Sequence, residues 1–272
     1  VGPENQRQTS HQWSGVVQYR LGINEDIFLG ASVRFDDYQR FDNATTYRFT
    51  AAWVFPDLEI KVRSSFGTGV AQPSFFELFG FNPNFFIGNP FLQPETSQGW
   101  DVGLDYTFAN GRGLLSATYF DSNLKKEIFT DFTVFPFTAA NRLGASMRDG
   151  LEFSLKLMPA DGASLAASYS YIDARDDNGL RELRRPKQQG SINVAYQFLD
   201  DRAGLDFGVN YNGVMLDREF ILATPKTIVT LGDYILGSLA VSYAVSEKVQ
   251  VVGRVENLFD YSYQEVFGFA SP

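Results

Sequence analysis

The sequence predicts an all-β fold, an antiparallel up-and-down transmembrane β-barrel of which about twelve strands are present. Three observations lead to this class: apolar and polar residues alternate over long segments, short connections alternate with long ones, and aromatic residues make up 15% of the 272 residues. The mean hydropathy is only −0.17, as expected when apolar and polar positions cancel in the average. No apolar run reaches the ~18 residues that a spanning helix requires.

The alternation has a period of two, which is the period of a strand with one apolar and one polar face. Residues 100–108 show it clearly: Trp100, Val102, Leu104, Tyr106 and Phe108 share one parity, while Asp101, Gly103, Asp105 and Thr107 take the other. The same division is found at 58–64, 150–157 and 204–212.

Segments of this kind predict strands longer than those of soluble proteins, which usually have about five to six residues. A tilted strand needs about nine to eleven residues to cross a bilayer. The predicted strands are 12–22, 26–36, 44–55, 58–68, 97–108, 112–124, 143–158, 163–174, 188–198, 204–214, 231–245 and 248–259. No helical period longer than a turn or two is present.

The connections between these strands alternate in length. The short ones are rich in Gly, Pro, Asp and Asn, as tight turns require; they read GINED, FPD, ANG, MPADGA, LDDRA and VSE. The long ones are DYQRFDNA, the connection within 69–100, KEIFTDFTVFPFTAANR, DARDDNGLRELRRPK and GVMLDREFILATPKT. In an up-and-down sheet all short turns lie at one end and all long loops at the other, which is typical of outer-membrane barrels.

The faces of such a sheet follow from the parity. We expect Trp100, Val102, Leu104 and Tyr106 to face lipid, and Asp101, Asp105, Glu152, Lys156 and Asn210 to face the lumen. A soluble β-sandwich or propeller also has alternating strands, but strand length, one-sided loops and aromatic residues near the strand ends favour the membrane protein.

Four phrases, in order along the chain, carry a resemblance. They are SSFGTGVAQPSFFELFG followed by GNPFLQPETSQGWDVGLDY, then ASMRDGLEFSLKL, RRPKQQGSINVAYQF, and GRVENLFDYSYQEVFGF. The chain resembles the C-terminal part of the β-barrel of TonB-dependent outer-membrane receptors, and is most similar to the cobalamin and ferric-siderophore receptors.

The resemblance implies a larger, 22-stranded barrel with an N-terminal plug in its lumen. We therefore expect residues 1–272 to be one barrel-domain fragment, with the plug, the TonB-coupling box and the final strand missing. We also expect an open, strongly curved half-barrel, or a poorly zipped one, without continuous hydrogen bonding between 12–22 and 248–259.

Ligand contacts are expected in the extracellular loops. The connection within 69–100 contains seven Phe, four Pro and four Gly, and the resemblance implies that it closes over a bulky ligand or packs on neighbouring loops. Arginines near one strand end either contact lipopolysaccharide phosphates and neighbouring loops or bind an anionic ligand. The candidate residues are Phe75, Phe76, Phe79, Phe81, Phe85, Phe86, Arg181, Arg184, Arg185 and Tyr263.

Other chemistry finds little support in the residues. The one histidine, His11, lies at a segment edge as a lone surface histidine, so no catalytic residue is predicted. The absence of cysteine excludes disulfides and thiolate metal sites. Asp173–Gly179 does not follow the EF-hand spacing. A net charge of −9 without a basic stripe disfavours nucleic acid as a partner.

Together these observations predict an outer-membrane receptor of a Gram-negative bacterium, not an enzyme, for TonB-energised uptake of a ferric siderophore or cobalamin. Its expected partners are outer-membrane lipid, lipopolysaccharide, the ligand, and the TonB system through the missing plug. No cofactor and no metal site are predicted. The alternative is a passive pore or structural barrel that is complete in about twelve strands.

Overall fold

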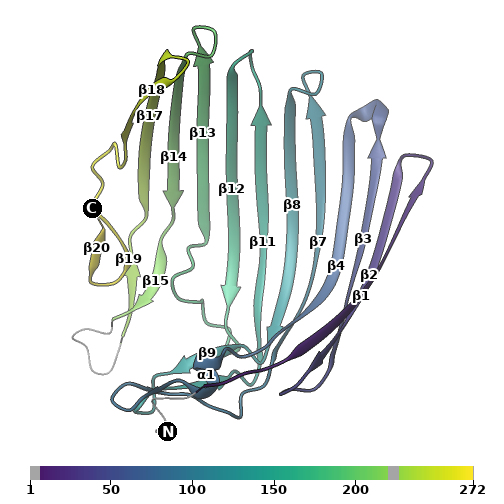
Figure 1. The fold of residues 1–272 in the computed structure, drawn as a ribbon, viewed down its shortest axis with the longest axis vertical. Coiled ribbons are helices and arrows are strands. Elements are labelled where there is room, and N and C mark those ends of the chain that lie inside the picture. Colours follow the sequence, from purple (N-terminus) through teal and green to yellow (C-terminus); the bar gives the residue numbers. More distant parts are fainter. Residues whose placement is uncertain (1–6, 220–226, 272) are drawn as a thin grey trace.

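The computed structural model describes residues 7–219 and 227–271, which form one large antiparallel sheet with small hairpins at one of its ends (Figure 1). Each strand pairs with the strands that precede and follow it among the sheet members. The twelve strands, in spatial order, are β1 (Gln12–Ile23), β2 (Ile27–Tyr38), β3 (Ala44–Phe55), β4 (Ile60–Ala71), β7 (Glu95–Phe108), β8 (Gly113–Lys125), β11 (Ala145–Leu157), β12 (Ala163–Arg175), β13 (Gln188–Phe198), β14 (Ala203–Asn212), β17 (Tyr234–Ser246) and β18 (Val249–Val255).

The predicted strands are confirmed, and only their ends differ. The sheet is extended at the long-loop end of β4 and β7, where Ala71 pairs with Glu95. In contrast, β18 is shorter than predicted, because it ends at Val255 and the predicted strand ended at residue 259. Asn257 there has a φ of 48°, and its side chain exchanges hydrogen bonds with the backbone of Tyr261. This local turn replaces ladder hydrogen bonds and ends the strand.

The two ends of the sheet differ as the connection lengths predicted (Figure 1). Short turns, one with the 3-10 helix η1 (Pro56–Leu58), join the strands at one end. At the other end the long connections contain secondary structure that the sequence did not predict. These elements are α1 (Phe75–Phe79) and the hairpins β5 (Phe81–Asn82) with β6 (Phe86–Ile87), β9 (Ile128–Asp131) with β10 (Thr138–Asn141), β15 (Met215–Arg218) with β16 (Ile228–Leu231), and β19 (Tyr263–Val266) with β20 (Phe269–Ser271).

The strand register separates the residues into two faces. Lys61 pairs with Asp105, Asp105 with Ser116, and Ser116 with Ser154, so polar residues form a continuous row across four strands. One position along, Val62, Leu104, Ala117 and Phe153 form an apolar row. All residues assigned to the lumen above share the polar face, and all those assigned to lipid share the other.

The polar face carries ion pairs at mid-strand. Asp105 accepts from Lys61 at 2.7 Å and from Arg63 at 3.3 Å, and Arg63 also donates to Thr118 at 2.7 Å. A hollow of about 950 Å³ is lined from Gln18 on β1 to Glu152 on β11. Because seven neighbouring strands line one hollow, this polar face is the concave side of the curved sheet.

Aromatic side chains mark two levels on the apolar face. Near the short turns, Trp53 stacks with Phe55 at 4.5 Å and Tyr196 with Phe198 at 5.4 Å between ring centroids. Nearer the long loops, Trp100 contacts Tyr119 at 5.4 Å. Along β7, Trp100 and Tyr106 are separated by six residues, or about 20 Å of strand. Because strands of such barrels are tilted by about 35–45°, this is about 15 Å of height, which fits within an apolar band of about 25 Å.

The sheet does not close on itself. Within the described residues, β1 pairs only with β2, and β18 only with β17, as the sequence predicted. The described residues also contain no helix that is long and apolar enough to cross a membrane.

The assignment of the two faces can be tested with nitroxide labels at neighbouring positions. We expect Leu104→Cys to carry a label that oxygen reaches readily from the lipid, and Asp105→Cys to carry one that a water-soluble relaxation agent reaches. Power-saturation electron paramagnetic resonance in bilayers measures both accessibilities. Higher oxygen accessibility at position 105 than at 104 would show that the faces are inverted.

Candidate functional site

The candidate site is the layer of loops at the long-loop end of the sheet. Its centre is an apolar cluster in which Leu78, Phe86 and Leu92 from one loop pack on Ala139 from the next, with Phe41, Phe79, Ile128 and Phe137 around them. Backbone hydrogen bonds fasten these loops together: Ile87 N–H donates to Phe137 O, and Phe137 N–H to Phe85 O, each at 2.9 Å. The aromatic connection is therefore folded and braced by its neighbour.

Helix α1 begins this loop through a capping box. The N–H of Glu77 donates to the Ser74 hydroxyl, and the Glu77 carboxylate accepts from the backbone N–H of Ser74 at 2.6 Å. The helix places the Phe76 ring parallel to that of Phe86, with 4.6 Å between centroids. At Gly88 the chain passes so close to α1 that an added Cβ would lie 2.6 Å from the backbone N of Phe79.

The predicted aromatic contacts divide into two groups. Phe86 is only 4% exposed, and Phe79 and Phe81 are partly buried. Phe75, Phe76 and Phe85 are exposed, which leaves their rings available.

Further exposed apolar side chains come from both loops. Phe91 is 88% exposed and Phe135 is 70% exposed, and Phe132, Val134 and Leu143 are also exposed. Phe135 contacts Phe137, which in turn contacts Phe85. We call Phe76, Phe85, Phe91 and Phe135 the aromatic rim. The FTDFTVFPF stretch was the sequence signal for the second loop's contribution.

Arg40, in the connection between β2 and β3, was not among the predicted site residues. Its guanidinium lies 5.0 Å from the centroid of the Phe79 ring and 6.0 Å from that of Phe75, and it donates to Gln8 at 2.9 Å. This cation–π contact joins the first long connection to the aromatic loop.

Ion pairs connect the next two loops. Arg142 contacts Asp177 at 2.8 Å and Glu127 at 3.2 Å. Arg148, at the outer part of β11, contacts both Glu127 and Glu182 at 3.0 Å. The side chains of these ion pairs are all at least three-quarters buried: Arg142, Arg148, Glu127, Asp177 and Glu182. Salt therefore screens the attraction between these charges less than it would at an open surface.

A fully buried carboxylate, Asp217 on β15, joins three loops. It accepts from Arg184 Nε, from the backbone N–H of Phe267 and from its neighbour Arg218 N–H, each at 2.8 Å. Burial acts to raise the pKa of Asp217, but these donors outweigh burial and hold the pKa below its ordinary value. Arg184 N–H also donates to Leu216 O at 2.7 Å. The Arg184 side chain thus has a structural partner.

The remaining predicted residues lie in the same layer. Arg185 forms an ion pair with Glu182, and Arg181 is partly buried, bridging the backbone of Arg175. The Tyr263 ring lies 4.3 Å from that of Tyr234, whose hydroxyl donates to Glu265 at 3.1 Å. The loop layer therefore neutralises Arg142, Arg148, Arg184 and Arg185 internally and presents aromatic rings to the outside. Such a surface is suited to recognition by stacking and shape.

Replacing one buried and one exposed Phe of the aromatic loop tests whether the buried cluster stabilises the loop. We expect Phe86→Ala to destabilise the loop cluster by about 3–5 kcal/mol, because it removes a buried ring and leaves a cavity. Phe91→Ala removes the same atoms from an exposed position and is expected to change loop stability by less than about 0.5 kcal/mol. Amide hydrogen exchange of residues 75–92 measures both. Equal protection in the two variants would mean that the cluster does not hold the loop.

The lowered pKa of Asp217 predicts acid sensitivity of the three-loop junction. Its contribution is complete above the unfolded-state pKa of about 3.9 and is lost as the pH falls through the lower folded-state pKa. Electron–electron distance measurements between labels at Leu180→Cys and Phe269→Cys are expected to give a narrow distribution at pH 7 and a broad one at strongly acidic pH. Adding Asp217→Asn should broaden the distribution already at pH 7. A distribution that stays narrow in that variant would contradict the role of this carboxylate.

Comparisons with known proteins agree with this architecture. A family described as TonB dependent receptor-like, beta-barrel, matches residues 2–258. Three similar solved structures are the pyoverdine outer membrane receptor FpvA of Pseudomonas aeruginosa PAO1 bound to pyoverdine (TM-score 0.76, 21% identity, 96% of this chain and 39% of that one), the siderophore receptor PirA of Acinetobacter baumannii (0.76, 17%, 93% and 42%) and the copper transporter OprC (0.76, 15%, 94% and 44%).

The chain thus spans less than half the length of these three structures. At these identities the structures support the fold, while the family match covers nearly every residue. Long alternating strands, one-sided loops and an open sheet with a polar concave face all agree with that match, and the chain belongs to the TonB-dependent receptor β-barrel family of outer-membrane proteins.

Proposed function

We propose that this chain supplies barrel wall and extracellular loops to a receptor that takes up a scarce, bulky nutrient across the outer membrane of a Gram-negative bacterium. The supporting observation is the family match over residues 2–258, found together with a braced loop layer that presents an aromatic rim. TonB supplies the energy for this uptake. Residues 1–272 act as one barrel-domain unit and carry no catalysis.

The ligand that we favour is a ferric siderophore. Of the three similar structures, one is a pyoverdine receptor, one is a siderophore receptor and the third is a copper transporter. Large metal complexes with aromatic or amide groups suit the exposed rings of the rim, since stacking needs no charge on the protein. Cobalamin is the other ligand that the sequence resemblance implied, and the growth experiment described below includes it as a second candidate ligand.

Predicted contacts follow from exposure. Phe75, Phe76 and Phe85 are candidates because their rings are exposed, and Phe91 and Phe135 join them. Among the polar candidates for ligand contact, Arg184 and Arg185 form ion pairs, whereas Arg181 and Tyr263 form none within the described residues. Arg181 and Tyr263 therefore stay proposed contacts. Phe86 stacks on Phe76 and Phe79 packs on the apolar cluster, so both have structural partners, as do Arg184 and Arg185 through Asp217 and Glu182.

Growth under nutrient limitation tests the function. A strain without this gene is expected to lose growth on one ferric siderophore as the only iron source, or on cobalamin as the limiting nutrient. The complete gene should restore growth only when TonB is present. Restored growth without TonB would favour the passive pore, the alternative function of a barrel of this kind.

Binding to whole cells tests the rim. We expect Phe91→Ala combined with Phe135→Ala to lower the affinity for the ferric siderophore at least about tenfold, which corresponds to about 1.4 kcal/mol. Phe198→Ala, at the opposite end of the sheet, is the matched control and should leave affinity unchanged. Equal affinity in all variants would remove the rim from the binding site.

A further inference from the structure

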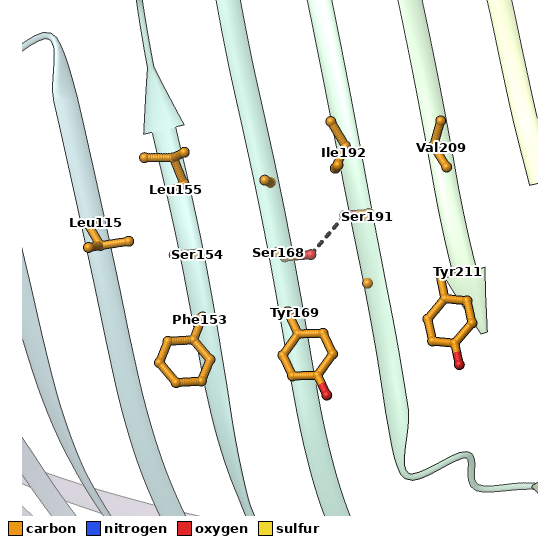
Figure 2. Close-up of a pocket in the computed structure, with 12 residues that line it drawn as sticks. Leu115, Phe153, Ser154, Leu155, Ser168, Tyr169, Ser191, Ile192, Val209 and Tyr211 are labelled. Carbon is orange, nitrogen blue, oxygen red and sulfur yellow. Dashed lines mark hydrogen bonds between the residues drawn. The ribbon is translucent and has the colours of Figure 1, made fainter. Parts of the chain in front are cut away.

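A hollow of about 400 Å³ lies on the lipid-facing side of the sheet, across β8 and β11–β14 (Figure 2). It is distinct from the loop layer and from the polar concave face. Its rim includes Phe153, Tyr169, Ile192 and Tyr211. The function proposed above makes no use of it.

Two small residues at its centre explain the hollow. Ala167 stands between Leu155 on β11 and Ile192 on β13, and Gly190 stands between Tyr169 on β12 and Tyr211 on β14. Large side chains around small ones leave a recess about one side chain deep. An added Cβ at Gly190 would lie 3.3 Å from the Ser168 carbonyl oxygen, so the recess reaches the backbone.

Such a recess in a membrane is filled by hydrocarbon. Its wall is formed by aliphatic and aromatic side chains, and an empty space there loses dispersion contacts on both sides. A single acyl chain is the part of a lipid that fits between separate side-chain rows. The hydroxyl groups of Tyr169 and Tyr211 both point toward the end where β13 begins, which is the long-loop end (Figure 2). This places the headgroup side of the recess toward the outer leaflet.

Cationic groups lie on the same face beyond the recess. Lys187 Nζ is 5.8 Å from the centroid of the Tyr171 ring and 2.8 Å from Asp173 Oδ1, and Arg175 contacts Asp173 at 2.9 Å. Tyr169 and Asp173 are four residues apart, or about 13 Å along the strand, within reach of one acyl chain. Above β12 and β13, Lys187 and Arg175 thus carry two positive charges, and Asp173 carries one negative charge.

Acidic groups on the neighbouring strands complete the charge pattern. The register places Asp121 on β8 and Asp149 on β11 beside Asp173 on the same face. Positive charge therefore lies above the centre of the recess, and negative charge lies to its β8 side. An anionic headgroup is expected above β12 and β13 and away from β8.

We propose that this recess binds one acyl chain of a lipopolysaccharide molecule in the outer leaflet, with a phosphate of its headgroup at Lys187 and Arg175. The site rests on the membrane placement of the sheet and does not depend on which nutrient the receptor transports. It fixes one lipid at a defined place on the barrel wall.

Lipid retention tests the site. The protein expressed from its complete gene is purified in mild detergent, incubated with purified lipopolysaccharide or with a phosphatidylethanolamine, and analysed by native mass spectrometry. Ala167→Phe fills the recess and is expected to lower lipopolysaccharide affinity at least about tenfold, since it displaces several methylene groups. Lys187→Gln is expected to lower it about fivefold, as for loss of one cation near an anionic lipid.

Val241→Phe is the control, because Val241 lies on the same face of β17 and does not line the recess. It should retain lipopolysaccharide as the wild type does. Resistance of the folded barrel to unfolding in cold detergent confirms that each variant is folded, and Lys187→Gln, a surface substitution, keeps the test valid if Ala167→Phe does not fold. Unchanged retention in both Ala167→Phe and Lys187→Gln, or equal retention of phosphatidylethanolamine by the wild type, would overturn the proposal.

Discussion

Backbone hydrogen bonds between neighbouring strands are the constraint on which this structure depends. In a membrane each N–H and C=O must be paired within the protein, because no water reaches it. Here the pairing runs without interruption from β1 to β18, and it fixes which residues stand side by side. The Lys61–Asp105–Arg63 cluster and the recess around Ala167 both follow from that register. Among residues 7–219 and 227–271, no further strand pairs with the outer edges of β1 and β18, whereas a wider barrel would pair both edges.

Local sequence was sufficient to predict the strands that form the hydrogen-bonded sheet. Strands 44–55 and 188–198 were predicted at both ends, since alternation and turn residues are properties of adjacent positions. The end of β18 was not, because the Asn257 side chain forms a turn that competes with the ladder. The loop hairpins also escaped prediction: the β9–β10 hairpin contains the Phe-rich stretch 129–137, in which no polar parity marks a strand. Their formation depends on contacts with a separate loop, such as that of Phe137 with Phe85.

For the loop residues, too, local sequence did not predict which contacts form with residues far away in the chain. Aromatic enrichment identified the loop, but it did not separate buried Phe86 from exposed Phe91, because both belong to the same irregular segment. Arg184 was a reasonable candidate for an anionic ligand until Asp217, 33 residues away, was seen to accept from it. Distant pairing of this kind leaves no local signal in one sequence. Exposure and charge pairing, which only the fold provides, therefore decide which candidates remain.

The chain of contacts through the loops has a consequence for how such a receptor changes its specificity. Arg40 touches Phe79, Gln93 touches Asn141, Arg142 touches Asp177, Arg184 touches Asp217, and Asp217 touches Phe267, so each loop holds the next. Exchanging any loop between the first and the last would break two junctions at once. The exposed side chains of Phe91, Phe135 and Leu143 take part in none of these five junctions. Under the proposed function, single replacements at these exposed side chains would alter ligand recognition, while the junctions below them would stay unchanged.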